Sequence, residues 1–162
     1  MNTPIAWATD GGRQSRTLRV LHITAIPATA FFLLRRLIEE QRRAGYEVEL
    51  ACSQGEYLEE LRRLNIVVHP VRFSRRAVAL EHLLGFIDVY RLCRVRQFDL
   101  VHTHTPIASF LGRLAARMAG VRRIVYHMRA SWWESSLVGR VAFTVCEWIA
   151  GRVTSHVLTI NC

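Results

Sequence analysis

Lysine is absent from this 162-residue chain, and all 22 of its basic residues are arginine. Without lysine the chain has neither the Schiff-base side chain nor the phosphate-binding lysine of a P-loop. The patterns GxxxxGK[ST] and GxSxG are also missing. The turn after the first predicted strand reads TAIPATAFF, with no glycine where a dinucleotide-binding sheet has GxGxxG. These absences exclude P-loop and α/β-hydrolase chemistry and argue against simple binding of NAD or FAD.

Paired cysteines and long apolar runs are lacking too. The four cysteines are scattered without CxxC spacing, which predicts no disulfide framework and a reduced, cytoplasmic setting. The most apolar segment, residues 137–150, contains Arg140 and Glu147 and falls short of the roughly 20 apolar residues that span a bilayer. The amino terminus has no signal-peptide pattern. We therefore predict a flexible tail over residues 1–17 and one domain over residues 18–162.

The charge balance is one-sided, with 22 basic residues against 13 acidic ones and a formal net charge of +9. Such a field favours anionic partners: a sugar nucleotide, a lipid phosphate, a membrane surface or a nucleic acid. The arginine pairs near Phe31 and Phe32 could contact an anionic leaflet, although most such pairs are solvated helix faces. The sequence has no recognition-helix or RNA-binding signature, so we predict no nucleic-acid partner.

Apolar runs of strand length alternate with apolar positions at helical spacing. The predicted strands span residues 18–23, 48–52, 66–71, 100–104, 124–128 and 156–160. The predicted helices span residues 31–45, part of 53–65, 80–96, 106–119 and 137–152. In the helix over 80–96 the expected core contacts are Leu83, Leu84, Ile87, Tyr90 and Val95. The alternation predicts a doubly wound, mostly parallel, Rossmann-like α/β sheet of about six strands with helices on both faces.

The stretch FDLVHTHTPIASFLGRLAARMAG, residues 98–120, forms one strand, turn and helix unit of this pattern. Thr105 offers a side-chain oxygen as N-cap, Pro106 occupies the first helical position, and Gly120 ends the helix. Ligands of open parallel sheets bind beyond the carboxyl ends of the strands. His104 and Thr105 lie at such an end, so we expect them to line any site.

His102 and His104 are two residues apart on a predicted strand and therefore share a face. We expect His102 to be buried and hydrogen-bonded, whereas His104 either reaches a ligand or is buried as well. A zinc site needs a third ligand and usually a fourth, and no cysteine or carboxylate lies at suitable local spacing. The sequence therefore predicts no metal site.

The turn after the fifth strand carries Arg129, with Trp132 and Trp133 close behind. Arg129 is either a surface residue or a group that makes charged hydrogen bonds to a phosphate or carboxylate. The tryptophans suit stacking on a sugar ring, contact with a membrane interface, or packing on the next helix. Helix N-termini at the same edge would add anion-binding N–H groups.

Three segments resemble the N-terminal domain of the retaining glycosyltransferases of family 4 when taken together: AGYEV, DLVHTHTP and GRLAARMAGVRRIVY. The resemblance runs in order and spacing from Leu18 to Asn161. It implies one half of a GT-B enzyme, in which two Rossmann-like domains face each other and the C-terminal one holds most of the nucleotide-sugar. No cofactor is implied besides that donor substrate, and no catalytic residue is assigned.

In this family the turns after strands one, four and five face the cleft, and the last one usually carries a histidine beside the donor sugar. The aligned position here is Arg129, with His127 two residues earlier. The resemblance thus implies a set of substrate-binding residues: Thr24, Pro27, Thr29, His104, Thr105, His127, Arg129 and Ser131.

The expected function is the acceptor-side half of a glycosyltransferase that moves a sugar from a nucleotide-sugar to a glycan or lipid-linked sugar in cell-envelope polysaccharide synthesis. The C-terminal donor domain is expected in a longer protein or in a second chain, and this chain is expected to be inactive alone. We expect it in the cytoplasm, with peripheral contact at the inner face of the membrane. The alternative is a non-catalytic sugar- or phosphate-binding module that pairs with another chain.

Overall fold

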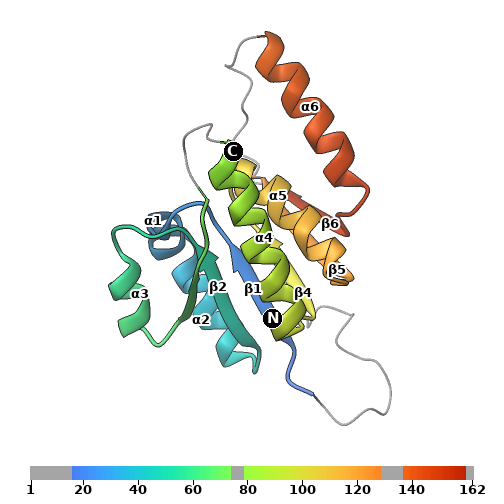
Figure 1. Cartoon of the computed structure of the whole chain (residues 1–162). Helices are drawn as coiled ribbons and strands as arrows, with labels where there is room; N and C mark the ends of the chain where they lie inside the picture. Colours follow the sequence, from blue (N-terminus) through green and yellow to red (C-terminus); the bar gives the residue numbers. More distant parts are fainter. Residues whose placement is uncertain (1–15, 74–78, 129–136, 160–162) are drawn as a thin grey trace.

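Six short runs rich in branched apolar residues form one parallel sheet, which the computed structural model shows in the order β3-β2-β1-β4-β5-β6 (Figure 1). The structure describes residues 16–73, 79–128 and 137–159. The strands are β1 Arg19–Ile23, β2 Glu47–Cys52, β3 Val67–Pro70, β4 Leu100–Thr103, β5 Arg123–Met128 and β6 His156–Thr159. The predicted six-stranded, doubly wound sheet is confirmed. The predicted tail falls mostly outside the described residues.

Helical segments connect successive strands and cover both faces of the sheet (Figure 1). They are α1 Pro27–Thr29, the π-helical turn η2 Ala30–Leu34, α2 Arg35–Arg43, α3 Leu58–Arg63, α4 Ala79–Arg96, α5 Pro106–Met118 and α6 Leu137–Gly151. In this described part of the chain, no helix has the length and apolar character needed to cross a membrane.

The helix predicted over residues 31–45 begins earlier, at Pro27, and contains a π-helical turn. The wider turn keeps Ala30 and Leu34 fully buried against the sheet, while Phe32 and Leu33 between them are exposed. Single π-helical turns inside α-helices are often found at functional sites. This turn follows α1, close behind the carboxyl end of β1.

Two apolar clusters lie on opposite faces of the sheet. Segments η2, α2 and α3 cover one face with residues that include Leu34, Ile38, Leu58 and Leu61. Helices α4 and α5 cover the other face with residues that include Val89, Cys93, Ala108, Ala115 and Ala116. The central strands are therefore buried from both sides, as their mostly apolar sequences predict.

The buried face of α4 differs from the predicted one, because Leu83 and Val95 are exposed. The reason is a close approach at Gly85, where an added Cβ would lie 2.6 Å from the Phe73 ring. Only glycine allows the helix to lie this near residues 72–73. That contact turns Gly85, Val89 and Cys93, spaced four apart, toward the core.

Helix α6 is anchored to α5 by a buried arginine. The Arg113 guanidinium is fully buried and donates to Glu147 Oε1 at 2.6 Å and to Thr154 Oγ1 at 3.2 Å. Its Nε–H donates to the Ser109 carbonyl at 3.2 Å, and the group lies 4.2 Å from the centre of the Tyr126 ring. Among these partners Glu147 supplies the opposite charge.

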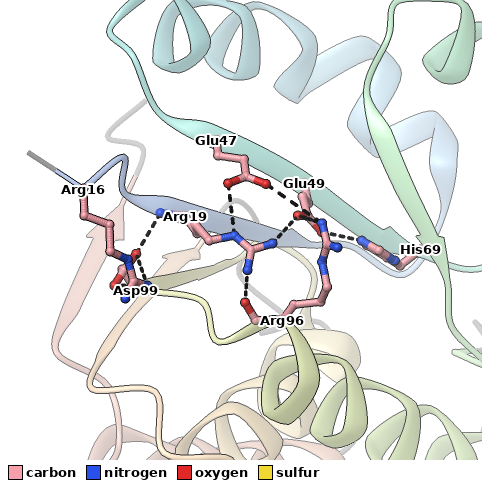
Figure 2. A network of polar contacts seen from close by, with 7 residues as sticks. All are labelled: Arg16, Arg19, Glu47, Glu49, His69, Arg96 and Asp99. Carbon is pink, nitrogen blue, oxygen red and sulfur yellow. Dashed lines mark hydrogen bonds and ion pairs between the residues drawn. The ribbon is translucent and has the colours of Figure 1, made fainter.

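A second polar network holds the end of α4 against the amino-terminal parts of β1 and β2 (Figure 2). Buried Glu49 accepts hydrogen bonds from Arg19, at 2.9 Å, and from Arg96, and it contacts His69 at 2.5 Å. Burial by itself would raise the pKa of Glu49, but the hydrogen bonds from Arg96, His69 and Arg19 outweigh it and lower that pKa below its ordinary value of 4.5. The network stabilises the sheet near the amino ends of β1 and β2, away from the carboxyl ends where the candidate site lies.

Candidate functional site

The centre of the sheet contains the point where the strand order reverses. β1 and β4 are neighbours there, and the helices that follow them cover opposite faces of the sheet. Ligands of doubly wound sheets bind at this switch point, beyond the carboxyl ends of the strands. We call residues 24–29 and 104–105, which follow β1 and β4, the rim.

Hydrogen bonds hold the two turns of the rim together. The His104 N–H donates to the Ile23 carbonyl at 3.1 Å, and the Ala25 N–H donates to Thr105 Oγ1 at 2.9 Å. The loop after β2 joins them, because the Ser53 N–H donates to the Ala25 carbonyl at 3.3 Å. The rim is thus a preorganised backbone surface rather than two separate loops.

Thr105 occupies the N-cap position of α5 with extended backbone angles, and Pro106 follows it as predicted. Its hydroxyl accepts the Ala25 N–H, however, and caps no N–H of α5. The cross-strand bond takes the place of the predicted cap. Since the Thr105 side chain does not cap the first turn of α5, the N–H groups of that turn favour an anion at the rim.

The predicted residues after β1 shape this turn. Thr24 is buried, and its hydroxyl donates to the Ile26 carbonyl at 3.0 Å. Pro27 is buried and begins α1, where an added Cβ on Gly55 would lie 3.5 Å from its ring. Thr29 is half-buried in the first helical turn. Thr24 and Pro27 therefore set the backbone of the rim, and Thr29 is the more accessible of the three.

A cluster of buried imidazoles lies beneath the rim. His22 on β1 is the register partner of His102 on β4, and His104 follows two residues later on the same face. The ring centres are 5.1 Å apart for His22 and His102, 5.1 Å for His22 and His104, and 4.1 Å for His102 and His104. We call these three residues the histidine cluster.

Gln41 of α2 orients the ring of His22. The His22 Nε2 lies 2.7 Å from Gln41 Oε1, and because an amide oxygen only accepts, this nitrogen carries the proton. The other nitrogen, Nδ1, lies 2.9 Å from His104 Nε2. When both rings are neutral, Nδ1 accepts a hydrogen bond from the Nε2–H of His104. Burial lowers the pKa of His22 to about 4, although the bond to Gln41 acts in the opposite direction. His22 is therefore neutral near pH 7.

The predicted residues of the first and fourth turns do lie together at the rim, and His102 is buried as predicted. His127 on β5 is half-buried beside them, with its ring centre 5.6 Å from that of His104. Four residues of the turn after β5 lie outside the described residues: Arg129, Ser131, Trp132 and Trp133. Ligand binding by all these residues stays a prediction.

His22 is the residue that sequence reasoning missed. Its signal was one polar residue in the otherwise apolar run VLHI, residues 20–23. The meaning of that signal depends on strand order, because only the pairing of β1 with β4 brings His22 beside two residues about 80 positions later.

Comparisons with known proteins show which longer proteins this chain is similar to. The Escherichia coli UDP-Gal:alpha-D-GlcNAc-diphosphoundecaprenol alpha-1,3-galactosyltransferase is 27% identical over 123 residues, which cover 72% of this chain and 31% of that enzyme. The MurG structure of Acinetobacter baumannii has 18% identity and a TM-score of 0.62, over 90% of this chain and 42% of that one. The Anabaena HepE structure, in complex with UDP and glucose, has 20% identity and a TM-score of 0.65. That match covers 86% of this chain and 37% of the HepE chain.

The chain thus spans less than half the length of each of these proteins, and the two structural matches concern the fold of this half. The family described as glycosyl transferase 4-like matches residues 22–134, which contain both turns of the rim and the histidine cluster. A match over more than half of the sequence, on the expected fold, identifies the family. This chain belongs to the glycosyl transferase 4-like family.

Proposed function

We propose that this chain is the N-terminal, acceptor-side domain of a retaining glycosyltransferase. The enzyme would move a sugar from a nucleotide-sugar to a lipid-linked sugar in cell-envelope polysaccharide synthesis. The observation that carries the proposal is the rim at the switch point, where the N-terminus of α5 is open to an anion. The name of the Escherichia coli relative contains a diphosphate-linked acceptor, and such a group suits this position.

The proposed chemistry needs stabilisation of negative charge. When the bond between sugar and nucleotide breaks, charge develops on the leaving phosphate, and fixed N–H groups in a water-poor site stabilise it. The first turn of α5, which the bond between Ala25 and Thr105 holds in place, would offer groups of the same kind to the diphosphate of the acceptor. A second Rossmann-like domain, in a longer protein or in a partner chain, would hold most of the donor.

Peripheral contact with the inner face of the membrane is part of this proposal. Phe32 and Leu33 are 65% and 51% exposed, and Arg35 and Arg36 beside them are exposed as well. Apolar side chains enter the interface while each arginine near an anionic leaflet adds about 1 kcal/mol. The buried free cysteines Cys52 and Cys93 suit a reduced, cytoplasmic compartment.

Binding tests the acceptor side. A short-chain lipid diphosphate that carries N-acetylglucosamine should shift the amide NMR signals of Ile107 and Ala108 in the first turn of α5. The same sugar-lipid without the diphosphate is the matched control and should leave them in place. No shift at millimolar ligand would refute the proposed site.

Turnover tests the enzyme. Membranes from cells that express the chain together with the donor domain, in the longer protein or as a partner chain, are given the acceptor and radiolabelled nucleotide-sugars, and transfer is scored on the lipid product. Retained stereochemistry in the product supports the retaining mechanism. Binding without transfer under any donor would favour the second hypothesis, a sugar-phosphate-binding module that pairs with another chain.

Sedimentation with vesicles tests membrane contact. The double variant Phe32→Ser, Leu33→Ser should weaken binding to anionic vesicles on the order of tenfold or more, because it removes two exposed apolar groups. Leu83→Ser on α4, where Leu83 is 56% exposed, is the control and should bind normally. Equal binding by all three proteins would contradict this part of the proposal.

A further inference from the structure

The histidine cluster has the donor set of a metal site. His22, His102 and His104 each offer one ring nitrogen, and these three atoms lie within 4.8 Å of one another. Neutral imidazole is a preferred ligand of Zn²⁺, Cu²⁺, Ni²⁺ and Co²⁺. The local sequence offered only His102 on β4 and His104 just after it, and β1 supplies the third histidine from the neighbouring strand.

The spacing of His22 and His104 fits an ion after a small adjustment. Two nitrogens bound to a tetrahedral zinc ion at about 2.0–2.1 Å are roughly 3.3 Å apart. In the structure His22 Nδ1 and His104 Nε2 are 2.9 Å apart. An opening of a few tenths of an ångström, with loss of the shared proton, would place an ion between them.

The residues around the histidine cluster also support a metal site. Ligating histidines usually donate their second N–H to an oxygen that fixes the ring, and Gln41 Oε1 has this position at His22 Nε2. His22 and His102 lie in register on adjacent strands, and the His104 N–H just after β4 is bonded to the Ile23 carbonyl. The centre of the sheet therefore positions two of the three donors, and this backbone bond positions the third.

We propose that His22, His102 and His104 bind one divalent transition-metal ion of the imidazole-preferring class, with a fourth coordination position left for an oxygen ligand. Within the described residues no cysteine, carboxylate or further histidine joins this set of converging donors. Three neutral imidazoles leave the double positive charge of the ion uncompensated. The fourth ligand would thus be an anionic oxygen, such as hydroxide or a phosphate group at the rim. This site is independent of the proposed transferase activity.

The experiment uses the full chain with a tag that contains no histidine, after removal of metals by a chelator. Calorimetric titration with ZnCl₂ should give one ion per chain. With CoCl₂ the protein should develop the visible absorption of four-coordinate cobalt. X-ray absorption of the zinc-loaded wild-type chain should show three imidazoles and no sulfur, and this measurement needs no variant.

Variants assign the ligands. His22→Asn and His104→Asn should each weaken zinc binding by more than about 100-fold, and Gln41→Leu, which removes the orienting oxygen, by roughly 10–100-fold. His156→Gln is the matched control, because His156 is exposed on the edge strand β6, and it should bind zinc as the wild type does. If a cluster variant does not fold, the ligand count from the wild-type spectrum decides.

Three results would overturn the proposal: no stoichiometric binding by the wild-type chain, a spectrum with sulfur or with fewer than three imidazoles, or full affinity in folded His22→Asn and His104→Asn proteins. None of these outcomes depends on sugar transfer. The metal site can therefore fail while the proposed function stands, and the reverse also holds.

Discussion

The ion pair of the buried Arg113 on α5 shows whether burial or distance decides how much an ion pair stabilises the fold. Arg113 contacts Glu147 at 2.6 Å, and Arg43 contacts Glu40 at the same 2.6 Å. The two pairs differ in environment, because the side chains of the first are 0% and 20% exposed and those of the second 71% and 56%. If burial decides how much an ion pair stabilises the fold, neutralising Glu147 will lower the free energy of unfolding much more than neutralising Glu40.

Glu147→Gln would leave the Arg113 guanidinium buried, with only neutral partners in Thr154, Ser109 and the Tyr126 ring. Removal of one partner from a fully buried pair costs about 3–5 kcal/mol. Because Glu147 is partly exposed and glutamine still offers an acceptor oxygen, we expect a loss of about 2–4 kcal/mol in the free energy of unfolding. Glu40→Gln should change it by no more than about 0.5 kcal/mol.

Urea unfolding followed by circular dichroism measures both variants. The expected result is a lower midpoint for Glu147→Gln at an unchanged slope m, and a midpoint for Glu40→Gln that matches the wild type. Equal losses in the two variants would refute the reasoning, because distance and not burial would then decide the cost. A change in m for Glu147→Gln would show instead that α6 detaches from α5 before the rest unfolds.

Three further predictions concern single positions. The lowered pKa of Glu49 means that its stabilising effect is full above its ordinary value of 4.5 and is lost as pH falls through the folded-state value. Glu49→Gln should therefore flatten the decline of unfolding free energy below pH 4.5, and a slope equal to that of the wild type would contradict this. Gly85→Ala should cost about 1–3 kcal/mol through its clash with Phe73. Gly151→Ala, which meets no atom within 4 Å, should cost nothing or stabilise by up to about 1 kcal/mol, and equal melting temperatures of the two alanine variants would count against the packing argument. Thr105→Val should lose about 1–2 kcal/mol because the half-buried Ala25 N–H loses its acceptor, whereas Thr105→Ser should retain most of the stability. Equal melting temperatures of the two Thr105 variants would contradict this prediction.

The sheet could be predicted because its signals are local. Each strand is a short apolar run, and helices between the runs permit only a parallel arrangement with right-handed crossovers. The position of Thr105 before Pro106 placed the start of α5 correctly. The partner of its hydroxyl, Ala25, was beyond prediction because it lies 80 residues away in sequence.

The errors have the same origin in long-range contacts. The periodicity of α4 is ambiguous by itself, and the approach of Phe73 to Gly85 decides which face is buried. Likewise, the candidate metal donors include His22, whose role appears only when β1 pairs with β4. Patterns of residue type thus predicted elements and their order, whereas rotation of a helix and convergence of side chains needed the assembled sheet.

The order of the strands also has a consequence for synthesis. Strands β1, β2 and β3 come from residues 19–70, so half of the sheet leaves the ribosome as one continuous piece. The other edge of β1 pairs with β4, residues 100–103, which is synthesised about 30 residues after β3. During that interval the future centre of the sheet is an exposed edge, with backbone groups ready to pair with another chain. A nascent chain stalled there would be the form of this protein most prone to aggregate.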